Sequence, residues 1–211
     1  RHDDGELALK EGTVGLRPFQ SDAKYRKLWV KTGDVRREFP FEREEKDEQR
    51  VSRMWRLVRR GEIDGSLDIL SGRPFTGKQY QRMTFHSGQG ELGVDNQGLN
   101  RWGMYFVQGR PYEGELYVRS QKPTTFFVAL ESNGGARVYA EQSLQVNTDS
   151  WQLLTFTLVP DATDKKGQFA IKLKEAGSVD LGYVFLQRGE WGRYKGLPVR
   201  RDVAEALIDQ G

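Results

Sequence analysis

Charged and aromatic side chains alternate with apolar ones between residues 112 and 120, and this stretch is the first that suggests chemistry. Successive side chains of a β-strand point to opposite faces, so one set of alternate positions faces a core and the other faces solvent or a polar ligand. Apolar or small residues take the first set, at positions 112, 114, 116 and 118. The stretch therefore predicts a strand whose other face carries Glu113, Glu115, Tyr117 and Arg119.

Carboxylates on such a face raise the question of catalysis. Acid–base hydrolysis needs two carboxylates on either side of the reacting bond, one of them with a raised pKa. The carboxylates expected on outer faces are Glu113, Glu115, Glu131 and Glu141. None of them stands in a recognisable catalytic motif, so we expect them to be solvated or to accept hydrogen bonds from a ligand. The chain is not expected to be an enzyme.

Metal-ion and cysteine chemistry have little support. The 211 residues contain no Cys, which excludes disulfides, cysteine-ligated zinc and cysteine nucleophiles. His86 has no partner at a metal-binding spacing, and the second histidine is His2. A turn histidine is therefore the better interpretation of His86.

Charge and hydropathy limit the partners. The sequence has 33 basic and 30 acidic residues, a near balance that argues against a nucleic-acid-binding protein. Basic residues recur every three positions from Arg50 to Arg59, with Trp55 among them, and we expect them to pair with the acidic run at residues 41–50 rather than with nucleic acid. No apolar run reaches 18 residues, so no membrane-spanning segment is expected.

The elements that position these side chains are expected to be strands. From residue 63 to residue 186, short segments alternate with period two, and Gly, Pro, Asn and Ser separate them. Residues 86–90 (HSGQG) and 108–111 (QGRP) are interpreted as turns, and Asn133 with the two following glycines is a hairpin signal. The sequence therefore predicts an all-β, antiparallel β-sandwich of the jelly-roll type over residues 51–190.

The two ends differ from this pattern. Residues 1–50 are charged and alternate poorly, which favours an extension or linker, with residues 28–30 as its candidate for docking on the sandwich. In the tail, residues 191–211, Val203, Leu207 and Ile208 stand at helical spacing. A short helix over residues 199–210 is expected, with that apolar stripe exposed.

The tail also carries a resemblance to a known family. Residues 192–211, GRYKGLPVRRDVAEALIDQG, resemble the segment that enters the catalytic barrel of family 51 glycoside hydrolases, which are α-L-arabinofuranosidases and endoglucanases. The upstream part is similar to the inserted sandwich of that family and to carbohydrate-binding modules of families 4, 9, 16 and 22. Its matching stretches are residues 74–85 (PFTGKQYQRMTF), 96–103, 112–120, 128–132 (VALES) and 151–160. The matching tail positions are Gly196, Leu197, Arg201, Asp202, Val203, Glu205, Ala206 and Leu207.

The resemblance implies a non-catalytic carbohydrate-binding module with two partners, a polysaccharide and the catalytic barrel of the parent chain. It also implies a secreted or periplasmic protein, although the first residues contain no apolar signal segment. The catalytic Asn-Glu motif and nucleophilic Glu of the family are not in this sequence. Related modules hold a structural calcium with a carboxylate in the last strand. Here Asp180 is displaced from that position by two residues, so no cofactor is expected.

A sugar ligand would use the outer face described above. Sugars stack their apolar C–H faces on aromatic rings, and their hydroxyls hydrogen-bond to polar side chains. Tyr117 is the first candidate for stacking, with Glu113, Glu115 and Arg119 beside it and Trp102 and Tyr105 in the preceding strand. Two alternatives remain: a sandwich that only braces the barrel, and a small complete hydrolase. An exposed aromatic in a polar groove would favour binding, and a carboxylate pair about 5–10 Å apart across a cleft would favour hydrolysis.

Overall fold

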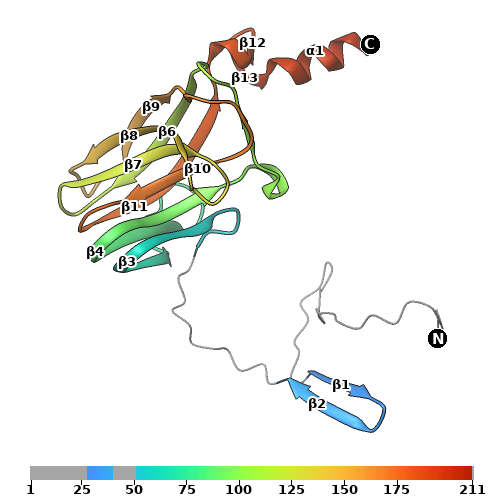
Figure 1. Ribbon diagram of the computed structural model, residues 1–211. Coiled ribbons are helices and arrows are strands. Elements are labelled where there is room, and N and C mark those ends of the chain that lie inside the picture. Colours follow the sequence, from blue (N-terminus) through green and yellow to red (C-terminus); the bar gives the residue numbers. More distant parts are fainter. Residues whose placement is uncertain (1–27, 40–50, 211) are drawn as a thin grey trace. The chain divides into compact units, whose positions relative to one another are not determined.

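The computed structural model describes residues 28–39 and 51–210, which fall in two units, residues 1–47 and 48–211 (Figure 1). In the first unit, β1 (Leu28–Thr32) and β2 (Val35–Phe39) form an antiparallel hairpin, with Gly33 at a φ of 60° in its turn. The expected extension therefore contains regular structure. The docking of residues 28–30 on the sandwich stays a prediction, and the acidic run at residues 41–50 lies outside the described residues.

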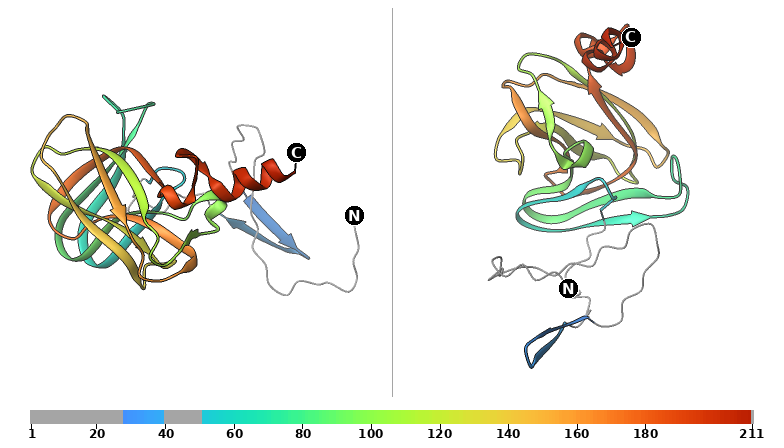
Figure 2. Two further views of the ribbon diagram at one scale, coloured as in Figure 1. Left: turned by 90° about the horizontal axis from the view of Figure 1, so that it is seen from above. Right: turned by 90° about the vertical axis from the view of Figure 1, so that its right-hand side faces the viewer.

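The second unit is an antiparallel β-sandwich, as predicted (Figures 1 and 2). One layer, the front sheet, has the order β9–β6–β11–β4, and the other, the back sheet, has the order β8–β7–β10–β4. Strand β5 pairs with β10, and β3 pairs with β4. The strands are β3 (Arg56–Leu70), β4 (Tyr80–Asn96), β5 (Met104–Phe106), β6 (Tyr112–Arg119), β7 (Thr124–Glu131), β8 (Val138–Val146), β9 (Gln152–Leu158), β10 (Asp164–Leu173) and β11 (Gly177–Arg188).

Strands β3 and β4 belong to both sheets, and they are longer than the sequence suggested. The first part of β4 pairs with β11 in the front sheet, and its last part pairs with β10 in the back sheet. The expected turn at residues 86–90 is therefore wrong, because these residues lie inside β4. Gly88 and Gly90 have φ values of 109° and 141°, and a side chain on either would overlap the backbone of β3. The glycines thus allow β4 to bend close against β3 where it leaves one sheet and enters the other.

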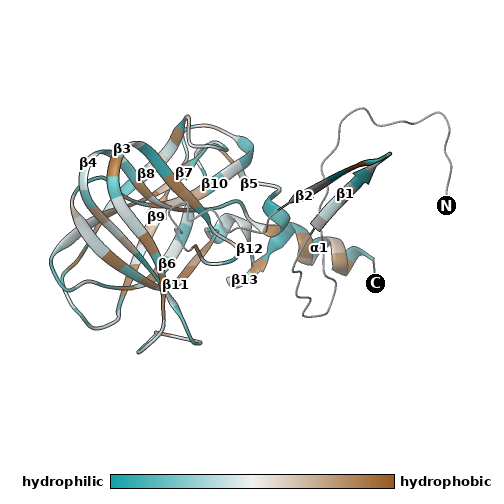
Figure 3. Cartoon of the chain, turned by 90° about the horizontal axis from the view of Figure 1, so that it is seen from below, coloured by the Kyte–Doolittle hydropathy of each residue, from teal (hydrophilic) through white to brown (hydrophobic). Residues whose placement is uncertain are grey.

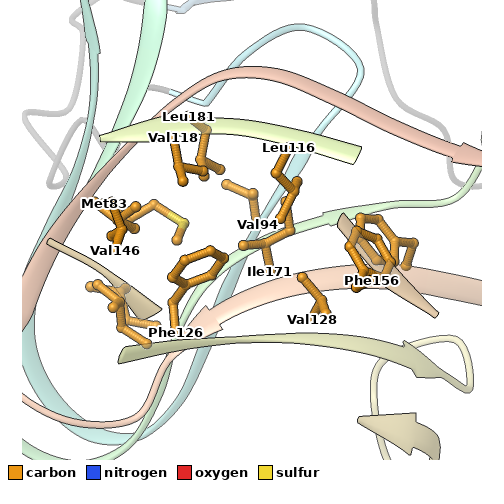
Figure 4. Close-up of a cluster of buried hydrophobic side chains, with 14 of the residues drawn as sticks. Met83, Val94, Leu116, Val118, Phe126, Val128, Val146, Phe156, Ile171 and Leu181 are labelled. Atoms are coloured by element: carbon orange, nitrogen blue, oxygen red, sulfur yellow. The ribbon is translucent and has the colours of Figure 1, made fainter. Parts of the chain in front are cut away.

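Alternate residues of the strands form the core, as the period-two pattern predicted. In β6, Tyr112, Leu116 and Val118 are buried, and Leu116 and Val118 lie in one cluster with side chains from the other sheet such as Phe126 and Ile171 (Figure 4). The hydropathy colouring shows apolar residues spread along all the strands of the sandwich (Figure 3). Burial of each such side chain stabilises the fold by about 1.5–3 kcal/mol, so the core fixes which face of each strand points outward.

The C-terminal tail leaves the sandwich after β11. A 3₁₀ turn, η2 (Glu190–Gly192), leads into the short pair β12 (Arg193–Tyr194) and β13 (Leu197–Arg200), and then into α1 (Arg201–Asp209). The predicted helix is confirmed, and its stripe is exposed: Val203 by 43%, Leu207 by 66% and Ile208 by 59%. Within the described ranges, none of the helices has the length and apolar character needed to cross a bilayer.

Candidate functional site

The outer surface of β9, β6 and β11, here called the front face, brings together most of the predicted site residues. Strand register places Glu113, Glu115 and Tyr117 in the middle of this face, with side chains of β9 and β11 on either side. Glu115 is exposed, whereas Glu113 and Tyr117 are half-buried, so the predicted alternation of β6 is confirmed. The three cross-strand rows are Thr157–Glu113–Gln187, Thr155–Glu115–Phe185 and Leu153–Tyr117–Tyr183.

One end of the front face is aromatic. Tyr117 stacks on Phe75, with 3.7 Å between ring centroids and 14° between ring planes, and Tyr183 meets Tyr117 edge-on at 6.2 Å. Phe75 belongs to the 71–79 loop, which folds onto the face, and Phe75 and Tyr183 are each more than a third exposed. Tyr117 is therefore not the free platform that the sequence suggested, because Phe75 covers one side of its ring. The rings open to a ligand at this end are those of Phe75 and Tyr183.

Arg119 has a different role from the one predicted. Its side chain is only 11% exposed, because Arg119 Nε donates to Asp180 Oδ2 at 3.0 Å and the guanidinium lies over the rings of Tyr80 and Trp151 at 4.7 and 4.4 Å. Arg119 Nη1 and Trp151 Nε1 both donate to the Arg73 carbonyl oxygen, at 3.2 and 3.0 Å. Arg119 thus holds the 71–79 loop on the front face, and the expectation that it is largely exposed was wrong.

Asp180, the residue considered for calcium, is engaged by two guanidinium groups. Arg82 Nε donates to Asp180 Oδ1 at 2.6 Å, and Arg82 Nη2 donates to Asp180 Oδ2 at 2.9 Å, on the side opposite Arg119. The Asp180 side chain is 6% exposed. Its buried charge is therefore compensated by two arginines within the protein.

The other end of the front face is a polar groove of about 560 Å³, here called the front groove. Phe185 lies in it, half-buried, beside the carboxylates of Glu113 and Glu115 and the exposed hydroxyls of Thr155 and Thr157. Gln187, Arg193 and Gln142 of β8 also line it, and Arg193 Nη2 lies 3.0 Å from Glu113 Oε2. Tyr183, Phe185 and Gln187 were not predicted as site residues from the sequence. Period two applied to β11 from Tyr183 onward would have placed all three on one face.

A second groove, the basal groove, adjoins the front groove at the end of the sandwich that bears the tail. It has a volume of about 730 Å³ and shares Phe185, Gln187 and Arg193 with the front groove. Trp102, which is 72% exposed, and Tyr105, which is 45% exposed, lie in the basal groove. The six predicted residues thus separate into three places: Glu113 and Glu115 in the front groove, Tyr117 and Arg119 at the aromatic end, and Trp102 and Tyr105 in the basal groove.

The tail forms one wall of the basal groove. Asp202 lies 3.3 Å from Arg188 Nη1 of β11, and it also pairs with Arg200. The hydrogen bond from Arg200 lowers the pKa of Asp202 to about 2, so this carboxylate is ionised at neutral pH. The pair with Arg188 connects the start of α1 to the sandwich.

The outer surface of the back sheet, by contrast, is occupied by the protein's own charges. Lys172 is fully buried there, with its Nζ 2.8 Å from Glu91 Oε1 and 3.1 Å from Glu141 Oε2, and it also pairs with the fully buried Glu131. Arg60 Nη2 lies 2.7 Å from Glu131 Oε2. Because each charge has an opposite partner, this surface offers fewer free polar groups to a ligand than the front face does.

Arg56 and Arg60 of β3 form ion pairs with carboxylates other than those expected. Arg56 pairs with Asp95 of β4 at 2.8 Å, and Arg60 pairs with Glu91 of β4 and Glu131 of β7. Their place in the sequence had predicted pairing with the acidic run just before them. The structure corrects that assignment for Arg56 and Arg60, since strand pairing brings carboxylates 31 to 71 positions away beside them.

The charge cluster of the back sheet predicts acid sensitivity. Burial alone would raise the pKa values of Glu91 and Glu141, but hydrogen bonds from Lys172, Arg60 and Lys174 outweigh it and lower both. A carboxylate with a lowered pKa in the folded state stabilises the fold above its unfolded pKa and loses that contribution as the pH falls. We expect the melting temperature to fall as the pH drops from about 5 toward 3.

Asp95 acts in the opposite direction, because burial raises its pKa despite the nearby Arg56. Because the pKa of Glu91 is lowered, substitution of Glu91 by glutamine should reduce the fall in melting temperature between neutral and acid pH. Calorimetry across that pH range would measure the difference. An equal fall in melting temperature for the unaltered chain and for Glu91→Gln would contradict the role given to Glu91.

Comparisons with known proteins support the fold. No protein-family model matches the sequence, and no curated protein matches it significantly. Among solved structures, an arabinose-bound family 51 α-L-arabinofuranosidase matches with a TM-score of 0.63 and 22% identity over 75% of this chain. The chain spans about a quarter (26%) of the length of that enzyme.

Carbohydrate-binding modules also appear among the matches, with lower scores. A family 4 module has a TM-score of 0.45 and 19% identity, over 61% of this chain and 79% of its own. A family 22 xylan-binding domain from Paenibacillus barcinonensis has a TM-score of 0.45 and 14% identity, over 64% of this chain and 85% of its own. The match to the arabinofuranosidase, which has the higher TM-score, shows that the antiparallel β-sandwich of this chain also occurs within a family 51 enzyme.

Proposed function

We propose that this chain is a non-catalytic carbohydrate-binding module of a glycoside hydrolase and that it binds plant cell-wall polysaccharide on its front face. One observation carries the proposal: an aromatic ring, Phe185, lies in an open groove among carboxylates, hydroxyls, an amide and a guanidinium. The ring provides a surface for the C–H face of a sugar, and the polar groups match its hydroxyls.

The dimensions of the front face suit an extended ligand. Glu113 and Tyr117 are four residues apart on β6, which corresponds to about 13 Å along a strand. Over that length the surface changes from polar, at Glu113 and Thr157, to aromatic, at Tyr183 and Phe75. A sugar chain lying along β6 would meet hydrogen-bonding groups at one end and rings at the other.

Hydrolysis by this chain is a weaker candidate. Glu113 and Glu115 lie two positions apart on one strand and point to the same side, so they do not face each other across a bond. The Glu113 carboxylate is also engaged by Arg193. We therefore assign both carboxylates to ligand binding, with no covalent step.

A second role, as a connection to a catalytic barrel, is favoured by one specific feature. The exposed stripe of Val203, Leu207 and Ile208 on α1 is apolar, and exposed apolar patches commonly mark interaction sites. We propose that this stripe packs against the barrel of the parent protein. This role and sugar binding use different surfaces and are compatible, and both accord with a secreted or periplasmic protein.

Replacing Phe185 with alanine tests the binding proposal. Loss of one stacking ring should weaken polysaccharide binding about tenfold. Affinity gel electrophoresis with soluble xylan, arabinoxylan and β-glucan would measure it, and arabinoxylan is included because the arabinofuranosidase with the same fold was solved with arabinose.

The matched control is Phe127→Ala, which removes the same side chain from the outer surface of the back sheet. Equal retardation of the unaltered chain and of Phe127→Ala, with much weaker retardation of Phe185→Ala, is the expected pattern. If the unaltered chain migrates freely through all three polysaccharides, the function proposed here is wrong and the bracing role remains.

A further inference from the structure

Two polar side-chain atoms of the described residues are buried without a hydrogen-bond partner in the protein: Gln187 Oε1 and Arg193 Nε. Most buried polar groups in proteins are paired, and an unpaired one costs about 1–3 kcal/mol. One of these atoms is an acceptor and the other is a donor. The first therefore lacks a hydrogen-bond donor, and the second lacks an acceptor.

Both atoms belong to residues at the junction of the two grooves. Gln187 and Arg193 line the front groove and also the basal groove, together with Phe185. Gln187 comes from β11 and Arg193 from β12, so the junction lies where the tail leaves the sandwich. The Arg193 side chain is held by Glu113 through Nη2, which leaves its Nε uncommitted.

A hydroxyl group is the simplest ligand group that can bond to an acceptor and a donor together, because it donates one hydrogen bond and accepts others. A carboxylate or phosphate would satisfy Arg193 but would be repelled by the Gln187 carbonyl oxygen. An ammonium group would satisfy the Gln187 carbonyl oxygen but would be repelled by the Arg193 guanidinium. The pair therefore selects for a neutral, hydroxyl-bearing ligand.

We propose that Gln187 and Arg193 form a hydroxyl-recognition site at this junction and that one polyhydroxylated chain binds across both grooves through it. The inference rests on the function proposed above and specifies its ligand contact. Both residues line the grooves and are half-buried, and the terminal torsion of a glutamine side chain is broad, so the carbonyl oxygen is free to turn toward a ligand in the groove. Phe185 beside them supplies the stacking surface for the same sugar.

The test uses the whole chain with Gln187→Met, which keeps the length of the side chain and removes the amide, and with Arg193→Lys, which keeps the charge near Glu113 and removes Nε. Isothermal titration with soluble fragments of xylan, arabinoxylan and β-glucan should show about tenfold weaker binding for each variant. Gln145→Met is the control, since it makes the same change at an exposed position of β8, and its affinity should equal that of the unaltered chain.

Thermal unfolding in the absence of sugar separates recognition from a structural role. Because Gln187 Oε1 has no partner in the protein, its removal should leave the melting temperature unchanged or raise it. A variant that melts lower and also binds more weakly would show that Gln187 is structural, and unchanged affinity in both variants would show that solvent satisfies these atoms. Either result overturns the inference while leaving sugar binding intact, whereas absence of binding by the unaltered chain overturns the proposed function itself.

Discussion

Replacing Lys172 with methionine is expected to lower the free energy of unfolding by about 3–5 kcal/mol. Lys172 is fully buried and holds the carboxylates of Glu91, Glu131 and Glu141 together. Removal of the ammonium leaves Glu131, which is also fully buried, with an uncompensated share of its charge. Denaturant unfolding monitored by tryptophan fluorescence would measure the loss.

Lys174→Met is the matched control for this prediction. Lys174 pairs with Glu141 and Glu91 of the same cluster, but its side chain is 33% exposed. Solvent screens such a pair, so its loss should cost about 1 kcal/mol or less. Equal losses in the two variants would contradict the view that burial, and not charge pairing as such, makes Lys172 important.

Replacing Tyr117 with alanine is expected to have two effects. Binding should weaken about tenfold, because the ring backs Phe75 and Tyr183 at the aromatic end of the front face. Stability should fall by about 2 kcal/mol, somewhat less than for a fully buried ring, because the half-buried ring loses its stacking partner. Calorimetry and titration with soluble arabinoxylan would measure the two effects on the same preparation.

Tyr117→Phe separates the ring from its hydroxyl group. It keeps the stacking contact with Phe75 and should stay within about 0.5 kcal/mol of the unaltered chain. If Tyr117→Ala melts at the same temperature as the unaltered chain, then the 71–79 loop does not depend on this stack, and the aromatic end as described is wrong.

The sequence was sufficient to predict which side chains of β6 point outward, but not which distant residues contact them. Alternation is a local property, so Glu113, Glu115 and Tyr117 could be placed outward from positions 112 to 120 alone. The exposure of Arg119 could not be predicted, because it depends on Asp180, which is 61 positions away. The stack of Tyr117 on Phe75 likewise joins a strand to a distant loop, and such contacts leave no periodic signal.

The glycines of β4 show a second limit. Residues 86–90 have the composition of a turn, and a left-handed glycine serves a reversal and a bend equally well. The choice between them depends on pairing with β3 and on the change from β11 to β10 as partner. Arg193 was missed for a related reason, since the tail was assigned to a partner domain, whereas Arg193 lines both grooves of the sandwich.

The location of the ligand is the central claim, and NMR titration of the ¹⁵N-labelled chain with soluble xylan, arabinoxylan and β-glucan fragments tests it most directly. We expect saturable shifts of the backbone amides of β6, β9 and β11, extending to Trp102 and Arg193 when the fragment spans both grooves. The amides of β7 should be unaffected, and so should those of β8 and β10 away from the groove-lining Gln142 and Lys165. Shifts concentrated on those three back-sheet strands, or no shifts with any of the fragments, would contradict it.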